Sequence, residues 1–410
     1  MNIIIINHYA GSIIHGMEYR PFYLAREWVK LGHEVTIIAA SAAHLRSKDP
    51  NCNPAVLTEE IIEGIRYVWV KTPKYNGNGI GRVVNMLTFV YRLLRFGAKI
   101  NASYQPDVVI ASSTYPLDIY PSRRIANKNN AKLIFEVHDL WPLSPMELGK
   151  MSPYHPFIAS MQAAENYAYK NADKVVSLLP AAKEHMEQHY MEPEKFNYIP
   201  NGIDIAEWEN SSDVIPDTHS EIIASLKASG KFLVGYAGSH GIANSLDVII
   251  DAAALLMEHN VVFVLVGNGP EKERLIRKSS EKGVNNIFFL PPIKKKSIPD
   301  FLRRMDILFI GWQKNPLYRF GISPNKLLDY MMSAKPIIHA VKAANDIVSD
   351  SHCGLSIAPE DAPAVAAAVK SLTAMSQEEQ RQMGLRGKNY VVAHHNYADL
   401  ARKFIKTISG

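Results

Sequence analysis

The chain has 410 residues, which is about twice what one hydrophobic core usually serves, so two domains are expected. Its 47% apolar and 21% charged content exclude a disordered, collagen-like or low-complexity chain. A formal net charge of +5 is too small to indicate nucleic-acid binding by itself, and no nucleic-acid partner is expected.

The two cysteines, Cys52 and Cys353, lie far apart, which is more typical of a reducing compartment than of a disulfide framework. Residues 1–8 (MNIIIINH) lack the basic region and the cleavage site of a signal peptide. No stretch reaches the roughly 18 uninterrupted apolar residues of a spanning helix. We therefore expect a cytoplasmic protein without a structural metal cluster and without a membrane-integral segment.

Short apolar runs alternate with longer amphipathic stretches in the first half, a pattern typical of a parallel sheet with crossover helices. The strands are expected at residues 2–6, 34–39, 108–111, 133–137 and 174–178. The helices are expected near residues 20–31, 82–100, 120–127, 156–171 and 181–190.

Residues 209–217 are polar and rich in turn formers, which predicts a linker before a second alternating set. Strands are expected there at residues 232–236, 261–266, 287–290, 307–310 and 336–339, with helices near 245–258, 271–282, 298–304 and 326–333. Two doubly wound α/β domains facing across a deep cleft would bind ligands beyond the carboxyl ends of their strands.

Residues 264–270 (VLVGNGP) close a strand with two glycines and then open a helix. Such a loop lets backbone amides approach a phosphate or a ribose, although a tight strand-to-helix turn explains the same residues.

Residues 321–336 (GISPNKLLDYMMSAKP) are more specific. Ser323 and Pro324 suit the start of a helix, where free amides and Lys326 could hold a diphosphate. Asp329 lies three residues beyond Lys326 on the same helix face, where its carboxylate could accept hydrogen bonds from ribose hydroxyls. The alternative is a surface ion pair between these two residues.

Residues 329–336 also resemble the acidic signature of retaining GT-B-fold nucleotide-sugar glycosyltransferases of glycosyltransferase family 4. Three further segments resemble that family in order, namely residues 32–36 (GHEVT), 198–204 (YIPNGID) and 267–270 (GNGP). Within the family, residues 15–21 (HGMEYRP) and 136–142 (EVHDLWP) look most like transferases that build O-antigen and capsule chains, including fucosamine-type enzymes.

The resemblance implies a donor domain at residues 206–389 and an acceptor-side domain at residues 1–205, with residues 390–410 packing back on the latter. Asp329 matches the family glutamate that holds the ribose. The family's earlier glutamate is missing from residues 318–321 (YRFG), and its diphosphate-binding Arg and Lys are missing from residues 235–244. Donor binding is predicted for Gly16, Gly238, His240, Gly267, Asn268, Pro292, Asn325, Lys326, Leu327 and Asp329.

In the first half, His138 ends a strand and precedes Asp139, so we predict that this pair acts on the sugar or on the leaving group. A packing role for a lone histidine is the alternative. Acceptor contacts are predicted for His15, Glu18 and Arg20 in the loop after the first strand.

The histidine pairs His185/His189 and His394/His395 have no further ligand nearby in the sequence, so we interpret both as solvated helix residues and expect no metal site. The predicted activity is transfer of an N-acetylated amino sugar from a UDP-sugar to a lipid-linked glycan acceptor, with retention and without a metal or other cofactor. A UDP-N-acetylglucosamine 2-epimerase on the same fold and a non-catalytic nucleotide-sugar-binding scaffold remain alternatives.

Residues 79–100 predict an amphipathic helix whose only charges are positive. The polar positions Arg82, Asn85, Thr88, Arg92, Arg95 and Lys99 recur at intervals of three or four. Such a helix could lie on the inner face of the cytoplasmic membrane, or it could be a core helix covered on both sides.

Overall fold

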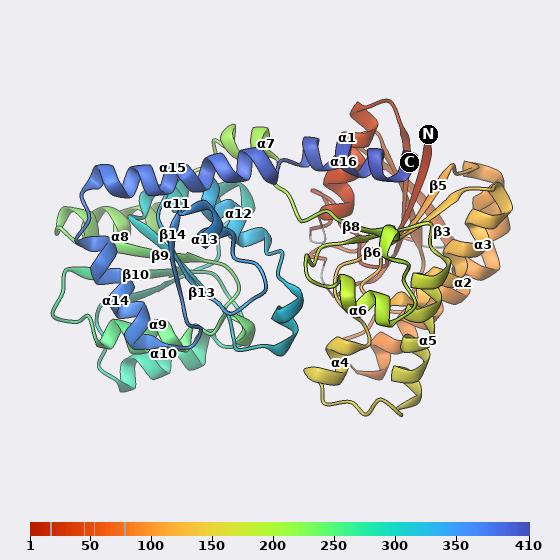
Figure 1. The fold of residues 1–410 in the computed structure, drawn as a ribbon. Coiled ribbons are helices and arrows are strands. Elements are labelled where there is room, and N and C mark those ends of the chain that lie inside the picture. Colours follow the sequence, from red (N-terminus) through yellow and green to blue (C-terminus); the bar gives the residue numbers. More distant parts are fainter. Residues whose placement is uncertain (17–18, 45, 53, 78) are drawn as a thin grey trace. The chain divides into compact units, whose positions relative to one another are not determined.

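The protein consists of two compact units in a computed structural model, which describes residues 1–16, 19–44, 46–52, 54–77 and 79–410 (Figure 1). The first unit comprises Met1–Asn201 and Tyr397–Gly410, and the second comprises Gly202–Asn396. Among the described residues, no helix is both long enough and apolar enough to cross a membrane.

The first unit contains an eight-stranded sheet in the order β3-β4-β2-β1-β5-β6-β7-β8. Only the pairing of β3 with β4 is antiparallel. Its strands are β1 (Asn2–Ile6), β2 (Glu34–Ala40), β3 (Leu57–Ile62), β4 (Ile65–Val70), β5 (Val108–Ala111), β6 (Lys132–Val137), β7 (Lys174–Ser177) and β8 (Phe196–Tyr198). Its helices are α1 (Arg20–Lys30), α2 (Ile80–Tyr104), α3 (Ile119–Asn129), α4 (Leu143–Glu147), α5 (Pro156–Asn171), α6 (Lys183–Gln188) and α16 (Tyr397–Ser409).

The second unit contains a six-stranded, entirely parallel sheet in the order β11-β10-β9-β12-β13-β14. Its strands are β9 (Phe232–Ala237), β10 (Val261–Val266), β11 (Ile287–Leu290), β12 (Ile307–Gly311), β13 (Ile337–Ala340) and β14 (Gly354–Ile357). Its helices are α7 (Ile205–Glu209), α8 (Asp217–Ala228), α9 (Asp247–Ala254), α10 (Lys272–Glu281), α11 (Ile298–Arg304), α12 (Asn325–Met332), α13 (Ile347–Ser351), α14 (Ala362–Thr373) and α15 (Gln377–His394).

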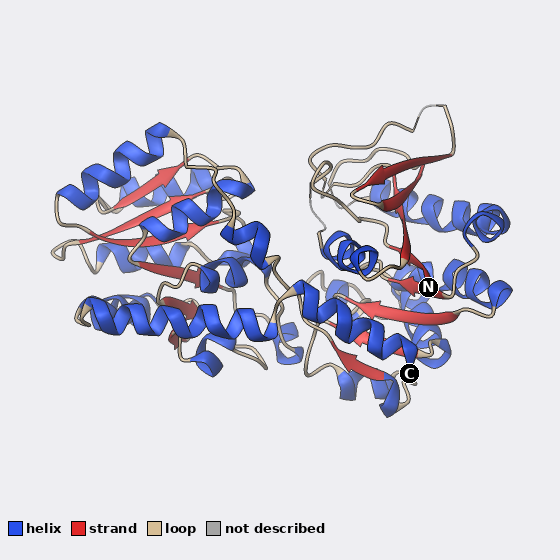
Figure 2. Ribbon diagram, turned by 90° about the horizontal axis from the view of Figure 1, so that it is seen from above, coloured by secondary structure: helices blue, strands red, loops and turns tan. Residues whose placement is uncertain are grey.

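The central strands are buried along nearly their whole length because helices cover both faces of each sheet (Figure 2). The apolar runs of the sequence arise from this double cover, and each unit has the Rossmann-like, doubly wound architecture predicted for a GT-B fold. Strands β3, β8 and β14 were not expected, because their residues are only partly buried or alternate with polar ones and give no continuous apolar run. Strand β4 was also missed, although it is nearly all buried and ends in the apolar run YVWV.

The boundaries of the units differ from the predicted ones at both chain crossings. The chain leaves the first unit after Asn201, and the segment predicted as a linker, residues 209–217, belongs to the second unit. Ile215 is buried there, and its backbone N–H donates to a carboxylate oxygen of Asp300 at 3.0 Å. The linker prediction was wrong because the polar residues around Ile215 concealed a segment that packs on the core.

The C-terminal helix α16 returns to the first unit, whereas α15 stays with the second (Figure 1). The indole N–H of Trp28 donates to the carbonyl of Ala401 at 3.1 Å, and its ring meets Phe404 edge-on at 5.1 Å between centroids. Residues 390–410 were predicted to pack back on the first unit, and the structure agrees with this prediction from Tyr397 onward.

Helix α2 differs from its prediction in which side chains meet the solvent. Asn85, placed in the predicted polar stripe, is completely buried and donates to the Thr72 hydroxyl at 3.1 Å. The guanidinium of Arg82 donates to the hydroxyl of Tyr9 at 3.1 Å, and that of Arg92 donates to a backbone carbonyl. These three polar side chains face inward because they satisfy groups of the first unit.

Candidate functional site

The carboxyl edge of the second sheet gathers the loops for which ligand binding was predicted. Strand β9 pairs with β10 on one side and with β12 on the other, so the strand order reverses beside it. Open parallel sheets bind ligands at such a switch point. The loops after β9 and β10 and the start of α12 meet here, and their contacts define the candidate donor site.

The side chain of Lys326 is partly buried at this edge. Its ammonium donates to the Tyr236 hydroxyl at 2.9 Å and to the side-chain oxygen of Asn244 at 2.8 Å, and it lies 4.5 Å from the centroid of the Tyr236 ring. Within the described part of the chain, no carboxylate lies within ion-pair distance of it. Burial therefore lowers the pKa of Lys326 to about 7.

Three glycines allow the loops to approach one another. A Cβ on Gly267, whose φ is +149°, would lie 1.9 Å from the carbonyl oxygen of Gly238. A Cβ on Gly269 would lie 2.5 Å from the carbonyl oxygen of His240, and one on Gly238 would lie 2.6 Å from the Lys326 side chain. A side chain at Gly267 or Gly269 would push the loops apart, and one at Gly238 would displace the end of the Lys326 side chain, so packing favours glycine at these positions.

His240 is fully buried between these loops, and neither ring nitrogen has a hydrogen-bond partner among the described residues. Burial, together with the charges of Lys272 and Lys326, lowers the pKa of His240 to about 4, so its imidazole is neutral at pH 7. Two unpaired polar atoms in a buried position are costly unless a ligand or water satisfies them. His240 is therefore suited to contact a bound molecule.

Lys272 is a second cation of the site that the sequence did not reveal. Its ammonium donates to the carbonyl oxygens of Gly267 and Leu290, both at 2.8 Å, and burial lowers its pKa. The available signal was its place two residues after the Gly-Asn-Gly-Pro loop, at the first position of α10. Lys272 and Lys326 together provide positive charge where the family's Arg and Lys are missing.

Asp329 has an environment different from that of Lys326. Burial raises the pKa of the Asp329 carboxyl to about 6, the charge of Lys295 opposes this shift, and the charge of Glu207 adds to it. The alternative interpretation, an ion pair between Asp329 and Lys326, is absent from the described contacts, since Lys326 turns toward Tyr236 and Asn244. The carboxylate is therefore not neutralised by the cation on its own helix.

The remaining predicted donor residues differ in access. Asn268, Pro292 and Asn325 are exposed, and the side chain of Asn268 accepts a hydrogen bond from the N–H of Gly269 at 2.9 Å. Leu327 is 1% exposed and belongs to the apolar core, so only its backbone is suited to a donor contact.

In the first unit, β6 ends in a buried cluster around Glu136. One carboxylate oxygen accepts from Arg20 Nε at 3.0 Å, and the other accepts from the Ser112 hydroxyl at 2.6 Å and lies 3.3 Å from His138 Nε2. Burial alone would raise the pKa of Glu136, but Arg20, His138 and Ser112 outweigh it and hold the pKa at about 2. Glu136, which sequence reasoning did not select, orients His138 through this network.

Arg20 is 2% exposed, and its guanidinium also donates to the carbonyls of Ile199 and Pro200. This position does not fit the direct acceptor contact predicted for Arg20, because its charge serves to compensate Glu136. His138 keeps a partly exposed side chain and Asp139 is exposed at the same strand end, so both remain accessible to a ligand.

The predicted loop after β1 is also more enclosed than expected. His15 is buried, with Nδ1 3.0 Å from the carbonyl oxygen of Lys48 and Nε2 3.0 Å from a carboxylate oxygen of Glu60. Its two nitrogens are thus occupied, which does not fit a direct acceptor contact. Gly16 has a φ of +89°, and a Cβ there would lie 2.6 Å from the Ser47 hydroxyl, while Glu18 lies outside the described residues.

Two family models match consecutive parts of the chain. The model of Glycosyltransferase Family 4 matches residues 14–207, and that of Glycosyl transferases group 1 matches residues 218–390. WcaI of Escherichia coli (strain K12), named as a colanic acid biosynthesis glycosyl transferase, is 20% identical over 97% of this chain and 99% of its own length.

Solved structures share the fold. Sucrose-phosphate synthase from Thermosynechococcus elongatus superposes with a TM-score of 0.71 and 16% identity, covering 98% of this chain and 97% of its own. Anabaena Alr3699/HepE in complex with UDP gives a TM-score of 0.71 and 16% identity, with both chains fully covered. At this identity the superpositions establish the fold, and the confirmed architecture is that of GT-B glycosyltransferases.

The Glu136 cluster predicts a specific change in acid stability. Glu136→Gln should lower the free energy of unfolding by about 3–5 kcal/mol at neutral pH, because it leaves the Arg20 charge buried without a counter-ion. A depressed carboxyl pKa contributes stability that is complete above about pH 4.5 and is lost as the pH falls toward 2. Urea unfolding between pH 7 and pH 2 should therefore show that the free energies of unfolding of the wild type and of Glu136→Gln converge at low pH. A constant difference between these free energies would contradict the lowered pKa of Glu136.

Proposed function

The chain is a GT-B glycosyltransferase whose first half matches Glycosyltransferase Family 4 and whose second half matches Glycosyl transferases group 1. We propose that it moves a sugar from a UDP-sugar to a lipid-linked glycan acceptor with retention of configuration. The observation that carries the donor class is the partly buried ammonium of Lys326, which faces polar groups but, among the described residues, no carboxylate. A diphosphate would supply the missing negative charge, and HepE, of similar fold, is described in complex with UDP.

The donor would span the loops that meet at the carboxyl edge of the second sheet. Lys326 and backbone amides of the β9 and β10 loops would hold the diphosphate, and Asp329 would accept hydrogen bonds from the ribose. These fixed charges and dipoles would stabilise the leaving diphosphate, so turnover should not require an added metal. In the first unit, His138, oriented by Glu136, would contact the reacting sugar or the acceptor.

The acceptor and sugar classes rest on two similarities. WcaI is named for colanic acid biosynthesis, which supports a role in surface polysaccharide assembly. The resemblance of residues 15–21 and 136–142 to fucosamine-type transferases supports an N-acetylated amino sugar. The protein would then work at the inner face of the cytoplasmic membrane on O-antigen or capsule chains.

A donor panel tests this function. UDP release and product formation should require both a UDP-linked amino sugar and a lipid-linked glycan, and His138→Ala should lower kcat on the order of 100-fold with UDP affinity retained. Lys406→Ala, an exposed change on α16, is the matched control. Conversion of the UDP-sugar without an acceptor would indicate an epimerase instead, and binding without turnover for every donor would indicate a scaffold.

The lowered pKa of Lys326 predicts how donor affinity depends on pH. Only the protonated ammonium attracts a diphosphate, and its pKa in the free protein is about 7, so UDP binding should weaken about tenfold for each pH unit above 7. Calorimetry with UDP from pH 6.5 to 9 measures this slope.

Uridine is the matched ligand, because it lacks the diphosphate and should bind with no such slope. Lys326→Ala should remove the pH dependence and lower the affinity for UDP far more than the affinity for uridine. Asp329→Asn should lower the affinity for both ligands equally. An unchanged slope in Lys326→Ala would assign the titration to another group.

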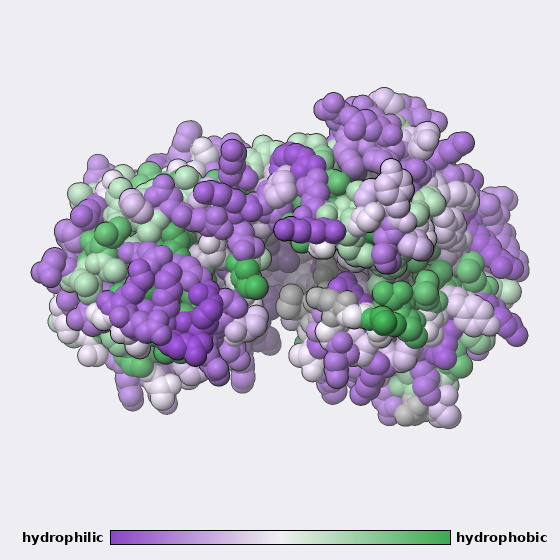
Figure 3. Space-filling model, turned by 90° about the horizontal axis from the view of Figure 1, so that it is seen from below, coloured by the Kyte–Doolittle hydropathy of each residue, from purple (hydrophilic) through white to green (hydrophobic). Residues whose placement is uncertain are grey.

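The membrane contact proposed for α2 involves a face that differs from the predicted polar stripe. Ile80, Val84, Leu87 and Tyr91 are exposed at intervals of four, three and four residues, so they form one apolar line along the helix. Arg95 is exposed further along the same face, with Lys99 beside it. Figure 3 shows a green apolar patch on the first unit, whereas a purple hydrophilic region covers the α10 part of the second.

An apolar line followed by two cations fits an anionic bilayer surface, where the side chains enter the head-group region and the cations meet lipid phosphates. We therefore expect co-sedimentation with anionic vesicles that is weaker at high salt. Arg95→Gln with Lys99→Gln should lower partitioning about thirtyfold at low salt, at roughly 1 kcal/mol per cation. Leu87→Ser with Tyr91→Ser should lower it at every salt concentration.

Val214→Ser, which changes an exposed apolar residue of the second unit, is the matched control and should partition like the wild type. Equal recovery of all proteins with anionic and neutral vesicles would exclude this contact.

A further inference from the structure

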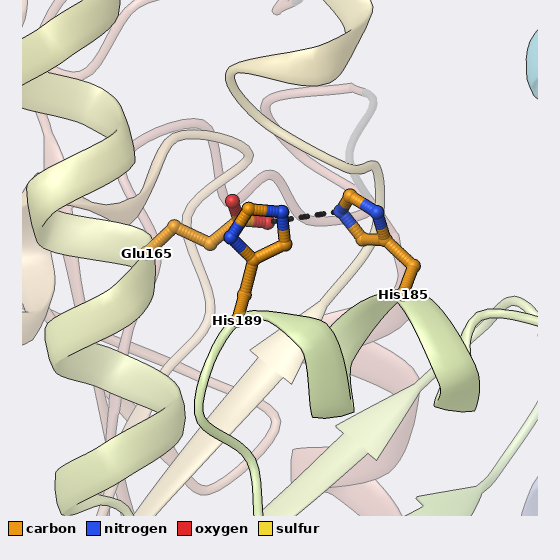
Figure 4. A group of neighbouring side chains, drawn as sticks. All are labelled: Glu165, His185 and His189. Atoms are coloured by element: carbon orange, nitrogen blue, oxygen red, sulfur yellow. Dashed lines mark ion pairs between the residues drawn. The ribbon is translucent and has the colours of Figure 1, made fainter.

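Three metal-binding side chains meet between α5 and α6 in the first unit. Glu165 lies on α5, His185 lies on α6, and His189 is the C-cap residue of α6 (Figure 4). One potential ligand atom from each side chain lies within 4.8 Å of the other two. The two histidines stand one helical turn apart, so the tertiary structure supplies the third ligand that was not apparent from the sequence.

The earlier interpretation of His185 and His189 as solvated is thus wrong. Both are partly buried, and His185 Nε2 lies 3.9 Å from Glu165 Oε1. The same interpretation is correct for only one residue of the pair His394/His395, since His394 is exposed but His395 is buried.

The Glu165 carboxylate is held in place by neighbours on its own helix. It is 2% exposed, with the Tyr169 hydroxyl donating to Oε1 at 3.1 Å and the Gln162 amide donating to Oε2 at 2.8 Å. Such outer-shell hydrogen bonds orient metal-binding carboxylates.

Side chains of α5 hold one ring nitrogen of His189. The side-chain nitrogen of Gln162 lies 2.8 Å from a carboxylate oxygen of Glu165, 2.8 Å from the side-chain oxygen of Asn166 and 3.0 Å from Nδ1 of His189. Nδ1 of His189 also lies 3.0 Å from that Asn166 oxygen, so polar side chains of α5 occupy Nδ1, and Nε2 is the ring nitrogen that a metal would take.

We propose that Glu165, His185 and His189 bind a divalent transition metal, with Zn²⁺ the best match. Two imidazoles and one carboxylate are a known zinc ligand set with a fourth position for water, whereas Mg²⁺ and Ca²⁺ prefer oxygen ligands alone. Bonds of about 2.0 Å in tetrahedral geometry place ligand atoms roughly 3.3 Å apart, so shifts of less than about 1.5 Å close the site.

The metal would join α6, a helix of only six residues, to α5. None of the three ligands belongs to the proposed donor contacts, so the site is structural or regulatory. A metal here is compatible with the expectation that catalysis itself needs no metal. The competing explanation is an ion pair in which a protonated His185 compensates the buried Glu165 without any metal.

Titration of the chelator-treated full chain with Zn²⁺ distinguishes the two explanations. We expect one equivalent to bind, with at least tenfold weaker affinity in Glu165→Gln and in His189→Ala. His394→Ala, an exposed histidine change in the second unit, is the matched control and should bind like the wild type. Cobalt(II) should give the visible absorption of a tetrahedral site in the wild type and in the control only.

A thermal melt with and without Zn²⁺ gives a second readout. The wild type and the control should gain apparent Tm, whereas His189→Ala, whose changed side chain lies at the partly exposed end of α6, should fold but not respond. Absence of stoichiometric binding by the wild type, or equal affinity in all four proteins, would overturn the proposal. Both results are independent of UDP binding, because the proposed donor contacts lie in the second unit and include none of the three metal ligands.

Discussion

The candidate donor site is arranged around the partly buried ammonium of Lys326, which has no carboxylate partner among the described residues. Lys326 is held by a phenol, an amide oxygen and an aromatic face, which together compensate a positive charge only in part. The low pKa of His240 and the close approach of the glycine loops follow from the same crowding of cations and backbone at the carboxyl edge of the sheet. An anionic ligand is the simplest group that would complete this arrangement.

Arg20 in the first unit illustrates the opposite case. Its guanidinium is more deeply buried than the Lys326 side chain, but it faces Glu136 at 3.0 Å and two backbone carbonyls, so its charge is compensated within the fold. The pKa of Glu136 falls accordingly, and the pair orients His138 rather than binding a ligand itself. Compensation of charge, more than burial, separates a structural cation from one that is suited to bind substrate.

The surface of the first unit carries two further features with different physical origins. The exposed line on α2 arises because its polar side chains Asn85, Arg82 and Arg92 turn inward, leaving apolar residues outside. The cluster of Glu165 with His185 and His189 arises because two helices distant in the sequence meet. Each feature depends on which face of a helix the rest of the unit covers.

Much of the architecture was determined by the sequence alone. Continuous apolar runs identify doubly covered strands such as β1, β10 and β12, and the glycine loop at residues 267–270 and the helix start at Lys326 are local patterns. Partly buried strands such as β3 and β14 escaped because exposure on one side removes that signal.

Only the tertiary structure decided the partners of the charged and polar groups. It enclosed His15 and Arg20, brought Lys272 to the donor loops, separated Lys326 from Asp329 and gave His185 and His189 a carboxylate. Sequence periodicity reports which face of an element is covered, but it carries no record of which distant residue covers it. The energy of a buried charge depends on that partner, and so the roles of these residues emerged only from the fold.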